Sequence, residues 1–132
     1  MSRRGEALIA EDYRESSSDA LRVLFCLGIS QSFFDAGADE RASAIDAFRQ
    51  AFDGLEARFG VRILGTMDDD ELMVGPSEGW PWTCYLLADV PDLKTVTAIT
   101  TLVRDWEVGP HRLWRYARIE ARVGRPLFFG NS

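Results

Sequence analysis

The stretch of residues 111–126, HRLWRYARIEARVGRP, carries aromatic and charged side chains at alternate positions. In a β-strand, successive side chains point to opposite faces of the sheet, so the two sets form separate surfaces. One set is mostly apolar and is typical of a core face: Leu113, Arg115, Ala117, Ile119, Ala121 and Val123. The other set is aromatic and then charged: Arg112, Trp114, Tyr116, Arg118, Glu120 and Arg122. Aromatic rings beside charged groups are typical of a pocket wall for a flat, partly polar molecule.

Three residues of this stretch are candidates for binding and catalysis. Arg118 and Glu120 would share one face about 7 Å apart, because a strand rises ~3.4 Å per residue. The guanidinium of Arg118 can hold a substrate carboxylate, and a Glu120 shielded by aromatic rings can exchange protons. A surface ion pair of little energetic value is an equally good interpretation. His111 is the only imidazole in the chain and can act as a general base, although a partly exposed residue at a strand entry is the more ordinary interpretation.

Two aromatic residues of a second apolar run extend the predicted pocket. Trp82, together with Trp114 and Tyr116, can stack on a flat ligand, and Tyr85 can offer its hydroxyl group to a carbonyl oxygen. Packing in the core or in a dimer interface is an equally good interpretation, because that use also demands buried aromatic rings.

Charged and sulfur-containing residues elsewhere add weaker candidates. Arg22 and Arg62 occupy the less apolar side of their strands and supply positive charge for an acidic ligand, or point to solvent. The acidic run 68–71 offers carboxylates that suit calcium or magnesium, but it lacks the spacing of a calcium loop and is expected to be a solvated turn. Cys26 and Cys84 are expected to be free, buried thiols, and one histidine without a CxxC motif predicts no metal site.

The composition of the whole chain excludes several classes of partner. The 132 residues have a formal net charge of -6, so they lack the clustered cations that bind nucleic acid or anionic membranes. No apolar run approaches the roughly 18 residues that span a bilayer, and the N-terminus lacks the apolar middle of a secretory signal. We therefore expect a cytoplasmic protein. No glycine-rich phosphate loop is present and no cofactor is predicted, although a borrowed flavin or haem stays open.

The hydrophobic periodicity predicts four strands and two helices. The strands are expected at residues 21–30, 61–67, 82–90 and 111–126, and the helices at residues 39–59 and between Asp92 and Gly109. Apolar residues recur at spacings of three and four along the first helix: Ile45, Phe48, Phe52, Leu55 and Phe59. Asp39 and Asp92 are expected to cap the two helices, and Gly60 to end the first. The polar residues 1–19 are expected to form a flexible tail before one domain over residues 20–132.

The β-α-β-β-α-β order predicts an α+β fold. Right-handed crossovers place both helices on one face of a four-stranded antiparallel sheet, which is the ferredoxin-like arrangement. Two helices cover only that face, yet the first and third strands are apolar on both faces. A sheet with one solvated face would alternate apolar and polar residues. The second face is therefore expected to pack against the same sheet of a second copy, as a homodimer with its pocket between sheet and helices or between sheets.

In this order of elements and in its two-sided sheet, the chain resembles the dimeric α/β-barrel superfamily over about residues 20–126. More narrowly, four stretches are similar to the IacB-like family, small proteins encoded in bacterial indole-3-acetate catabolic clusters. They are LFCLGISQSFFD, VRILGTMDDDELMVGPS, PWTCYLLADV and LWRYARIEARVGRPLF. The resemblance implies a dimeric α/β barrel and a part in the breakdown of aromatic compounds. It assigns no role to a single residue, because members of the superfamily place their working groups differently.

Two classes of function are compatible with these patterns. The first is a cofactor-independent isomerase, lyase or monooxygenase-like enzyme that acts on an aromatic or indole-like acid by proton transfer, rearrangement or an oxygen-dependent step. In it, Arg118 binds the carboxylate, Trp114 and Tyr116 stack on the ring, and Glu120 or His111 moves the proton. The second is a non-catalytic binding or accessory protein of indole-3-acetate degradation, which the absence of an unmistakable catalytic constellation favours. A sheet face that serves only as a dimer interface is a third interpretation.

Overall fold

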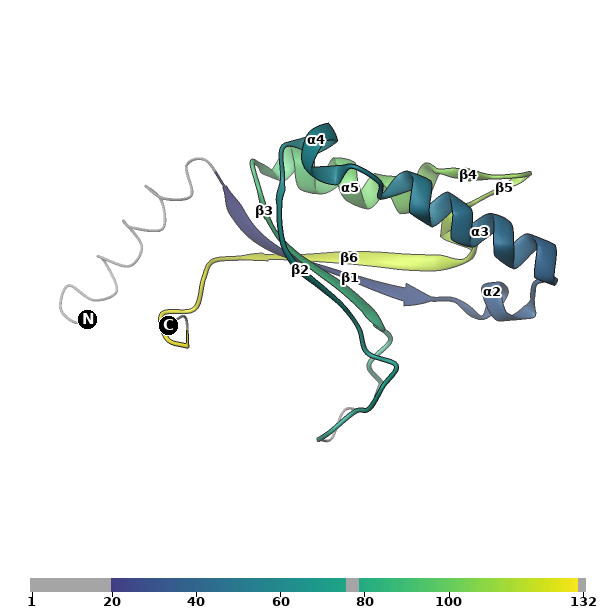
Figure 1. The fold of residues 1–132 in the computed structure, drawn as a ribbon, viewed down its shortest axis with the longest axis horizontal. Helices are drawn as coiled ribbons and strands as arrows, with labels where there is room; N and C mark the ends of the chain where they lie inside the picture. Colours follow the sequence, from purple (N-terminus) through teal and green to yellow (C-terminus); the bar gives the residue numbers. More distant parts are fainter. Residues whose placement is uncertain (1–19, 76–78, 131–132) are drawn as a thin grey trace.

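The central sheet has the strand order β2-β3-β1-β6, and every neighbouring pair of strands is antiparallel. The computed structural model describes residues 20–75 and 79–130. The strands of the sheet are β1 (Leu21–Ile29), β2 (Arg62–Asp68), β3 (Cys84–Val90) and β6 (Ala117–Gly124). The helices are α2 (Gln31–Asp35), α3 (Ala38–Ala51), α4 (Leu55–Phe59) and α5 (Leu93–Asp105). Helices α3 and α5 lie on the same side of the sheet (Figure 1), so the described residues adopt the predicted α+β, ferredoxin-like order.

The expected first helix over residues 39–59 is in fact two helices. Gly54 adopts a left-handed conformation with φ of 64°, which separates α3 from α4. Gly60, with φ of 69°, ends α4 as expected, because glycine lacks the Cβ atom that makes this region costly. The expectation that Asp39 caps the helix is wrong: Gly37 is the N-cap residue and Asp39 lies in the first turn. The connection expected before this helix contains the short helix α2.

The second helix begins where it was predicted, but it ends at Asp105 rather than near Gly109, because Glu107 and Val108 form the strand β4. Asp92 is the N-cap residue of α5, and its Oδ1 accepts a hydrogen bond of 2.8 Å from the backbone amide of Thr95. Val96, Ile99 and Val103 of α5 are buried, and their spacing of three and four residues places them on one face of the helix. None of the helices in the described part of the chain is long and apolar enough to cross a membrane.

The single long strand expected over residues 111–126 is wrong at its beginning. A small hairpin of β4 (Glu107–Val108) and β5 (His111–Arg112) is followed by a 3₁₀ turn, Leu113–Arg115, before β6 begins. Leu113 and Tyr116 are both fully buried, because a spacing of three residues places side chains on one side of a 3₁₀ helix. The alternation of faces therefore restarts at Ala117, and Tyr116 does not share a face with Arg118.

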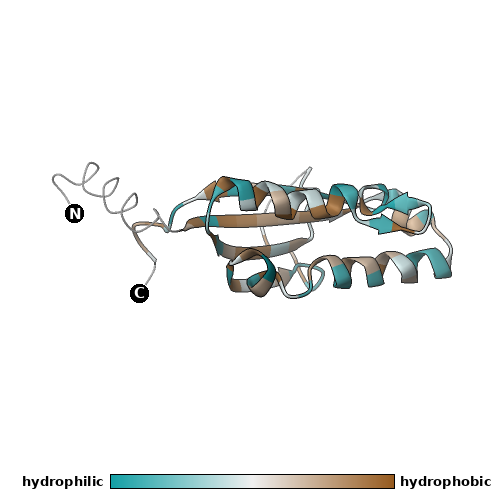
Figure 2. Cartoon of the chain, turned by 90° about the horizontal axis from the view of Figure 1, so that it is seen from above, coloured by the Kyte–Doolittle hydropathy of each residue, from teal (hydrophilic) through white to brown (hydrophobic). Residues whose placement is uncertain are grey.

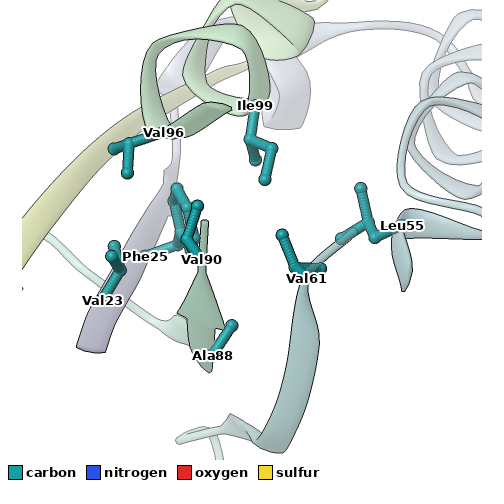
Figure 3. Packing of buried hydrophobic residues seen from close by; sticks show 8 residues of the cluster. All are labelled: Val23, Phe25, Leu55, Val61, Ala88, Val90, Val96 and Ile99. Carbon is teal, nitrogen blue, oxygen red and sulfur yellow. The ribbon is translucent and has the colours of Figure 1, made fainter. Parts of the chain in front are cut away.

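The core lies between the sheet and the helices. Figure 3 shows Val23, Phe25, Ala88 and Val90 of the sheet beneath Val96 and Ile99 of α5, with Val61 and Leu55 beside them. A second buried cluster packs the alanines of α3 against α5, the hairpin and the turn before β6. Its members are Ala44, Ala47, Ala51, Val103, Val108, Leu113, Tyr116 and Ala117. Seen from the helix side, α3 and α5 run side by side above strands that are predominantly hydrophobic (Figure 2).

The face of the sheet opposite the helices is called the open face below. The strand register places the following side chains on it: Arg22, Leu24 and Cys26 from β1, Arg62 and Met67 from β2, Tyr85, Leu87 and Asp89 from β3, and Arg118, Glu120 and Arg122 from β6. Its middle is apolar, and no helix of the described chain packs against it (Figure 1). The prediction that β1 and β3 carry apolar residues on both faces is therefore confirmed.

Candidate functional site

An apolar cavity of about 520 Å³ lies between α3 and the sheet, and we call it the α3 cleft. Its volume falls in the range of pockets that hold small organic ligands, roughly 300–1,000 Å³. Aromatic and aliphatic side chains from α3, β1 and β3 make up much of its lining: Leu27, Ile29, Phe48, Phe52 and Leu86. The rings of Phe48 and Phe52 are stacked, with centroids 6.2 Å apart and planes inclined by 25°. The cleft therefore suits a flat apolar molecule.

The amino-acid pattern of α3 explains why a cleft forms beneath it. Ala44, Ala47 and Ala51 occupy the face that packs against α5 and the hairpin, and all three are buried. Their small side chains let the helix approach these neighbours closely. Phe48 and Phe52 occupy the adjacent face and remain only half-buried. Because α3 is fastened by its alanine face, the phenylalanine rings lie over the sheet and form the wall of the cleft.

Few polar groups reach the α3 cleft, and they come from both of its walls. Arg49 of α3 is largely exposed and lies 3.6 Å from Oδ1 of Asp46, one turn earlier on the same helix. On the sheet wall, Asp68 of β2 is the cross-strand neighbour of Cys84 of β3, and both line the cleft. Thr66 adds a hydroxyl group on the same strand as Asp68. The cleft thus offers one cation, one carboxylate and one thiol around an apolar interior.

The thiol of Cys84 is not prepared for nucleophilic attack. Burial is the main cause that raises its pKa above the ordinary value; a hydrogen bond to Thr83 opposes it, and the carboxylates of Asp68, Asp69 and Asp70 each raise the pKa by a smaller amount. The thiolate is the nucleophilic form, and a raised pKa reduces its fraction at neutral pH. Cys26 also has a pKa raised by burial. Both cysteines are free, as expected from the sequence, and they lie on opposite faces of the sheet.

The side chain of Tyr85 lies on the open face and contacts the β2–β3 connection, although the residue also belongs to the lining of the α3 cleft. Its hydroxyl oxygen accepts a hydrogen bond of 2.6 Å from Nε1 of Trp80 and can donate to Oδ2 of Asp69, at 2.9 Å, or to the carbonyl oxygen of Trp82, at 3.0 Å. Burial raises the pKa of Tyr85, and the hydrogen bond to Asp69 acts in the same direction. The hydroxyl group predicted to meet a substrate carbonyl is therefore occupied by the protein.

Trp82, which was predicted to stack on a ligand, covers one end of the open face. A Cβ atom on Gly28 would lie 3.4 Å from its ring and 2.4 Å from the carbonyl oxygen of Pro81. The connection before β3 therefore crosses β1 at a position where only glycine fits. Trp82 packs on the protein at this point and is absent from the lining of the α3 cleft.

Arg118 and Trp114 lie next to each other, but not as a pocket wall. The guanidinium carbon of Arg118 is 4.2 Å from the centroid of the Trp114 ring, and a second cation, Arg104 of α5, lies 5.7 Å from the same ring. Nη1 of Arg118 donates to the carbonyl oxygens of Trp114 and Ala117. The guanidinium fork predicted to bind a carboxylate is thus partly used by the backbone at the edge strand of the sheet.

Glu120 lies on the open face, where β6 pairs with β1 opposite Cys26. Its Oε2 is 2.5 Å from Nη2 of Arg122 and is shielded from solvent, although the angles are not those of a hydrogen bond. The residue that we predicted as a proton carrier is therefore ion-paired. His111, the other predicted proton carrier, lies on the hairpin and does not adjoin β6.

Arg22 and Arg62 flank one carboxylate at the far end of the open face. Nε of Arg22 donates a hydrogen bond of 2.7 Å to Oδ1 of Asp89, and Arg62 is the neighbour of Asp89 on β2. Both arginines lie on the open face, outside the lining of the α3 cleft, and Arg22 is ion-paired with Asp89.

His111 and Tyr116 meet in a separate cavity of about 260 Å³ near the first turn of α3. The Tyr116 hydroxyl donates a hydrogen bond of 2.6 Å to Oε2 of Glu40, and Nε of Arg115 lies 3.3 Å from the same oxygen. The His111 and Tyr116 rings are edge to face, with centroids 6.5 Å apart. Tyr116 is fully buried, so it has no free ring face for the stacking role predicted from the sequence.

Two further observations concern metal binding and the surface of the open face. No group of three or more His, Cys, Asp or Glu side chains within residues 20–75 and 79–130 is arranged to hold a metal ion. On the open face, Leu24, Gly65, Thr66, Met67, Tyr85 and Leu87 surround a shallow hollow of about 390 Å³. The open face therefore offers an apolar surface.

Comparison with known proteins identifies the fold alone. The sequence matches no protein-family model, and a search of curated proteins finds no match. The methylated RPA0582 protein has a similar structure, with a TM-score of 0.53 and 14% sequence identity over 94% of this chain and 93% of that chain. A second structure of RPA0582, a protein of unknown function from Rhodopseudomonas palustris, gives a TM-score of 0.50 at 14% identity over 91% and 92% of the two chains. A dimeric protein of unknown function and ferredoxin-like fold from Bacteroides fragilis is less similar, with a TM-score of 0.41 and 12% identity over 80% of this chain and 95% of that chain.

Of the nine predicted site residues, Tyr85 alone is in the lining of the α3 cleft. The sequence indicated Phe48 and Phe52 only as members of an apolar stripe and did not single out Arg49. The alanines beside Phe48 and Phe52 were the available clue. When a helix packs against its neighbours through a face of small residues, the bulky residues on the adjacent face are directed away from that contact.

Proposed function

We propose that this protein is a homodimer that binds a small aromatic, indole-like molecule in the α3 cleft. The observation that carries the proposal is the cleft itself, about 520 Å³ of mostly apolar space beside the stacked rings of Phe48 and Phe52. An indole ring is flat and largely apolar, and it gains free energy by leaving water for such a surface. The sequence predicted a carboxylate on the ligand because of Arg118, but Arg118 lies outside the α3 cleft. The cleft therefore supports an aromatic ligand, and the charge of that ligand depends on the residues that line the cleft.

Binding is favoured over catalysis by the state of the reactive groups. The pKa of the Cys84 thiol is raised, Glu120 is paired with Arg122, and His111 lies in a different cavity from the α3 cleft. No nucleophile activated by a neighbouring base faces the cleft within the described residues. The non-catalytic binding or accessory role in aromatic degradation is therefore the form of the function that the geometry supports best.

Isothermal titration calorimetry with an uncharged indole tests this function. We expect saturable binding of 2-(indol-3-yl)ethanol to the full chain, with a negative heat-capacity change because apolar surface is buried. Thr66→Trp fills the cleft from an exposed strand position and should abolish the binding. Thr97→Trp, at an exposed position of α5, is the matched control and should bind as the wild type does. Equal binding by both variants would exclude the α3 cleft as the site.

Mass spectrometry of the recovered ligand separates a binding protein from an enzyme. A binding protein returns the ligand unchanged after prolonged incubation, whereas an enzyme returns a product or an isomer. Conversion that disappears in Glu120→Gln or His111→Asn would instead support the catalytic assignment made from the sequence.

The second copy in this proposal packs on the open face. A two-fold interface needs a patch that is complementary to itself. The open face has an apolar middle that includes Leu87 and a Met67 that is 57% exposed. Charges of both signs lie toward its ends, the pair of Arg22 with Asp89 and the pair of Glu120 with Arg122. This arrangement lets the two sheets bury apolar surface while each charged group faces an opposite charge.

Light scattering coupled to size-exclusion chromatography tests the dimer. We expect the mass of two chains for the wild type and the mass of one folded chain for Leu87→Lys, because the substitution places a charge in the middle of the interface. Thr97→Lys adds the same charge on the outer side of α5 and should remain dimeric. A wild-type protein that stays monomeric at micromolar concentration would refute the dimer.

A further inference from the structure

The carboxylates beside the α3 cleft outnumber the cations that neutralise them. Residues 68–71 form the acidic run Asp-Asp-Asp-Glu at the end of β2, and Asp68 lines the cleft. The ion pairs found in residues 20–75 and 79–130 join other side chains and leave this run without a basic partner. Asp69 accepts a hydrogen bond from Tyr85, which is a neutral donor. The sheet wall of the cleft therefore carries uncompensated negative charge at its end.

This negative charge acts inside the cleft as well as at its edge. The thiol of Cys84 lies on the cleft wall directly across from Asp68 in the β2–β3 register. The carboxylates of Asp68, Asp69 and Asp70 all disfavour ionisation of that thiol, in addition to the effect of its burial on the pKa. A group placed beside Cys84 therefore experiences a field that favours positive charge.

Arg49 on the opposite wall does not reverse this balance. Arg49 and Asp68 are both exposed, but Nη1 of Arg49 lies 3.6 Å from Oδ1 of Asp46, so its charge is offset by a neighbouring carboxylate, whereas Asp68 has no basic partner among the described residues. The faces of Phe48 and Phe52 add a contribution of the same sign as the acidic run, because the π-electrons of an aromatic ring attract cations. The net charge of -6 also draws cations toward the protein.

We propose that the molecule bound in the α3 cleft is an aromatic organic cation, such as an arylalkylamine, whose ammonium group pairs with Asp68. This inference rests on the proposed function, because it requires that the cleft bind an aromatic ring. It replaces the carboxylate expected from the sequence by a group of opposite charge. The ring packs against Phe48 and Phe52, and the ammonium group lies toward the β2 end of the cleft.

Calorimetry with three indoles that differ in the side-chain charge tests the assignment. The probes are tryptamine, which is a cation, 2-(indol-3-yl)ethanol, which is neutral, and indole-3-acetate, which is an anion. At low ionic strength we expect tryptamine to bind about fivefold more tightly than the neutral probe, as for a solvent-accessible ion pair, and indole-3-acetate to bind most weakly. The preference should shrink at about 1 M salt, where the screening length falls to roughly 3 Å.

Two variants locate the charge that is responsible. Asp68→Asn should bring the affinity for tryptamine to that for 2-(indol-3-yl)ethanol while leaving the neutral probe unaffected. Glu71→Gln makes the same change of charge at an exposed residue outside the cleft lining and should keep most of the preference. A preference that survives Asp68→Asn would overturn the assignment of Asp68.

The outcomes separate the failure of this inference from the failure of the proposed function. Equal affinity for all three probes would refute the cation while the cleft remains an aromatic site. Tighter binding of indole-3-acetate, lost in Arg49→Gln, would refute the cation in favour of an acid. Binding of none of the three would refute the proposed function, and the inference with it.

Discussion

The hydroxyl group of Tyr116 donates a hydrogen bond of 2.6 Å to Oε2 of Glu40 across 76 residues of sequence. The bond fastens the turn before β6 to the first turn of α3. Tyr116 is fully buried, and an unpaired hydroxyl at such a position is costly. The bond therefore helps to fix the position of α3 relative to the sheet, and so the distance between the two walls of the α3 cleft.

Tyr116→Phe should lower the free energy of unfolding by about 1–2 kcal/mol, because it removes a buried hydrogen bond to a carboxylate. Urea unfolding at pH 7 measures this loss as a lower midpoint with an unchanged slope. Glu40→Gln keeps an acceptor oxygen at the same position and should lose less. A Tyr116→Phe midpoint equal to that of the wild type would mean that the bond contributes nothing.

The stability difference between the wild type and Tyr116→Phe should depend on pH. The hydrogen bond from Tyr116 is the main cause that holds the pKa of Glu40 below its ordinary value, with Arg115 assisting. A depressed carboxyl pKa stabilises the fold above the pKa of the unfolded chain, about 4.3, and this contribution is lost as the pH falls through the folded-state value. The difference between the urea midpoints of the wild type and of Tyr116→Phe should therefore become smaller from pH 7 through pH 5 and 4 to pH 3. Curves that diverge as the pH falls would contradict this account.

Ala51→Leu should destabilise the protein by about 1–3 kcal/mol through overpacking. Ala51 is fully buried on the face of α3 that packs against its neighbours, so a larger side chain must push the helix outward. Ala42→Leu is the control, since Ala42 is exposed on the same helix and its replacement should change stability by less than about 0.5 kcal/mol. Thermal unfolding of both variants measures the difference, and equal melting temperatures would show that α3 is not closely packed at Ala51.

Gly28→Ala should be costly although Gly28 lies in a regular strand. A Cβ atom there would lie 2.4 Å from the carbonyl oxygen of Pro81, so the connection before β3 must move. We expect a loss of about 1–3 kcal/mol in the free energy of unfolding. Gly65→Ala, in β2, adds a Cβ atom with no neighbour within 4 Å and should be nearly neutral. If both variants unfold at the same urea concentration, the connection yields without cost.

The two thiols should react with a maleimide at different rates. Burial raises the pKa of both, so labelling of the folded protein at pH 7 should be slow for each. Cys84 is only half-buried and lines the α3 cleft, whereas Cys26 has no exposed surface. We expect Cys84 to be labelled first and a bound aromatic ligand to protect it, as peptide mass spectrometry would show. Labelling of Cys26 at the same rate would mean that the open face is more accessible than the structure has it.

The wall of the α3 cleft that α3 forms could not be predicted from sequence patterns. The sequence indicated the apolar stripe of the first helix, with Phe48 and Phe52, but not the adjacent face of three alanines, which is buried against α5 and the hairpin. Both faces satisfy the helical period. The choice between them depends on what lies opposite, and α3 lies opposite α5 and a hairpin more than fifty residues later in the chain.

The sequence by itself determined the order of the four sheet strands and the two main helices, the apolar faces of β1 and β3, and the start of α5 after Asp92. These follow from the alternation of neighbouring residues and from a local cap. Only the tertiary structure decided that the stretch predicted as one strand begins as a hairpin and a 3₁₀ turn. There, Leu113 and Tyr116 are pulled to one side by burial, and Tyr116 finds its partner in Glu40. It likewise decided where the cleft lies. Local periodicity specifies which residues seek burial, whereas contacts between distant segments decide which of them meet and which are left to line a cavity.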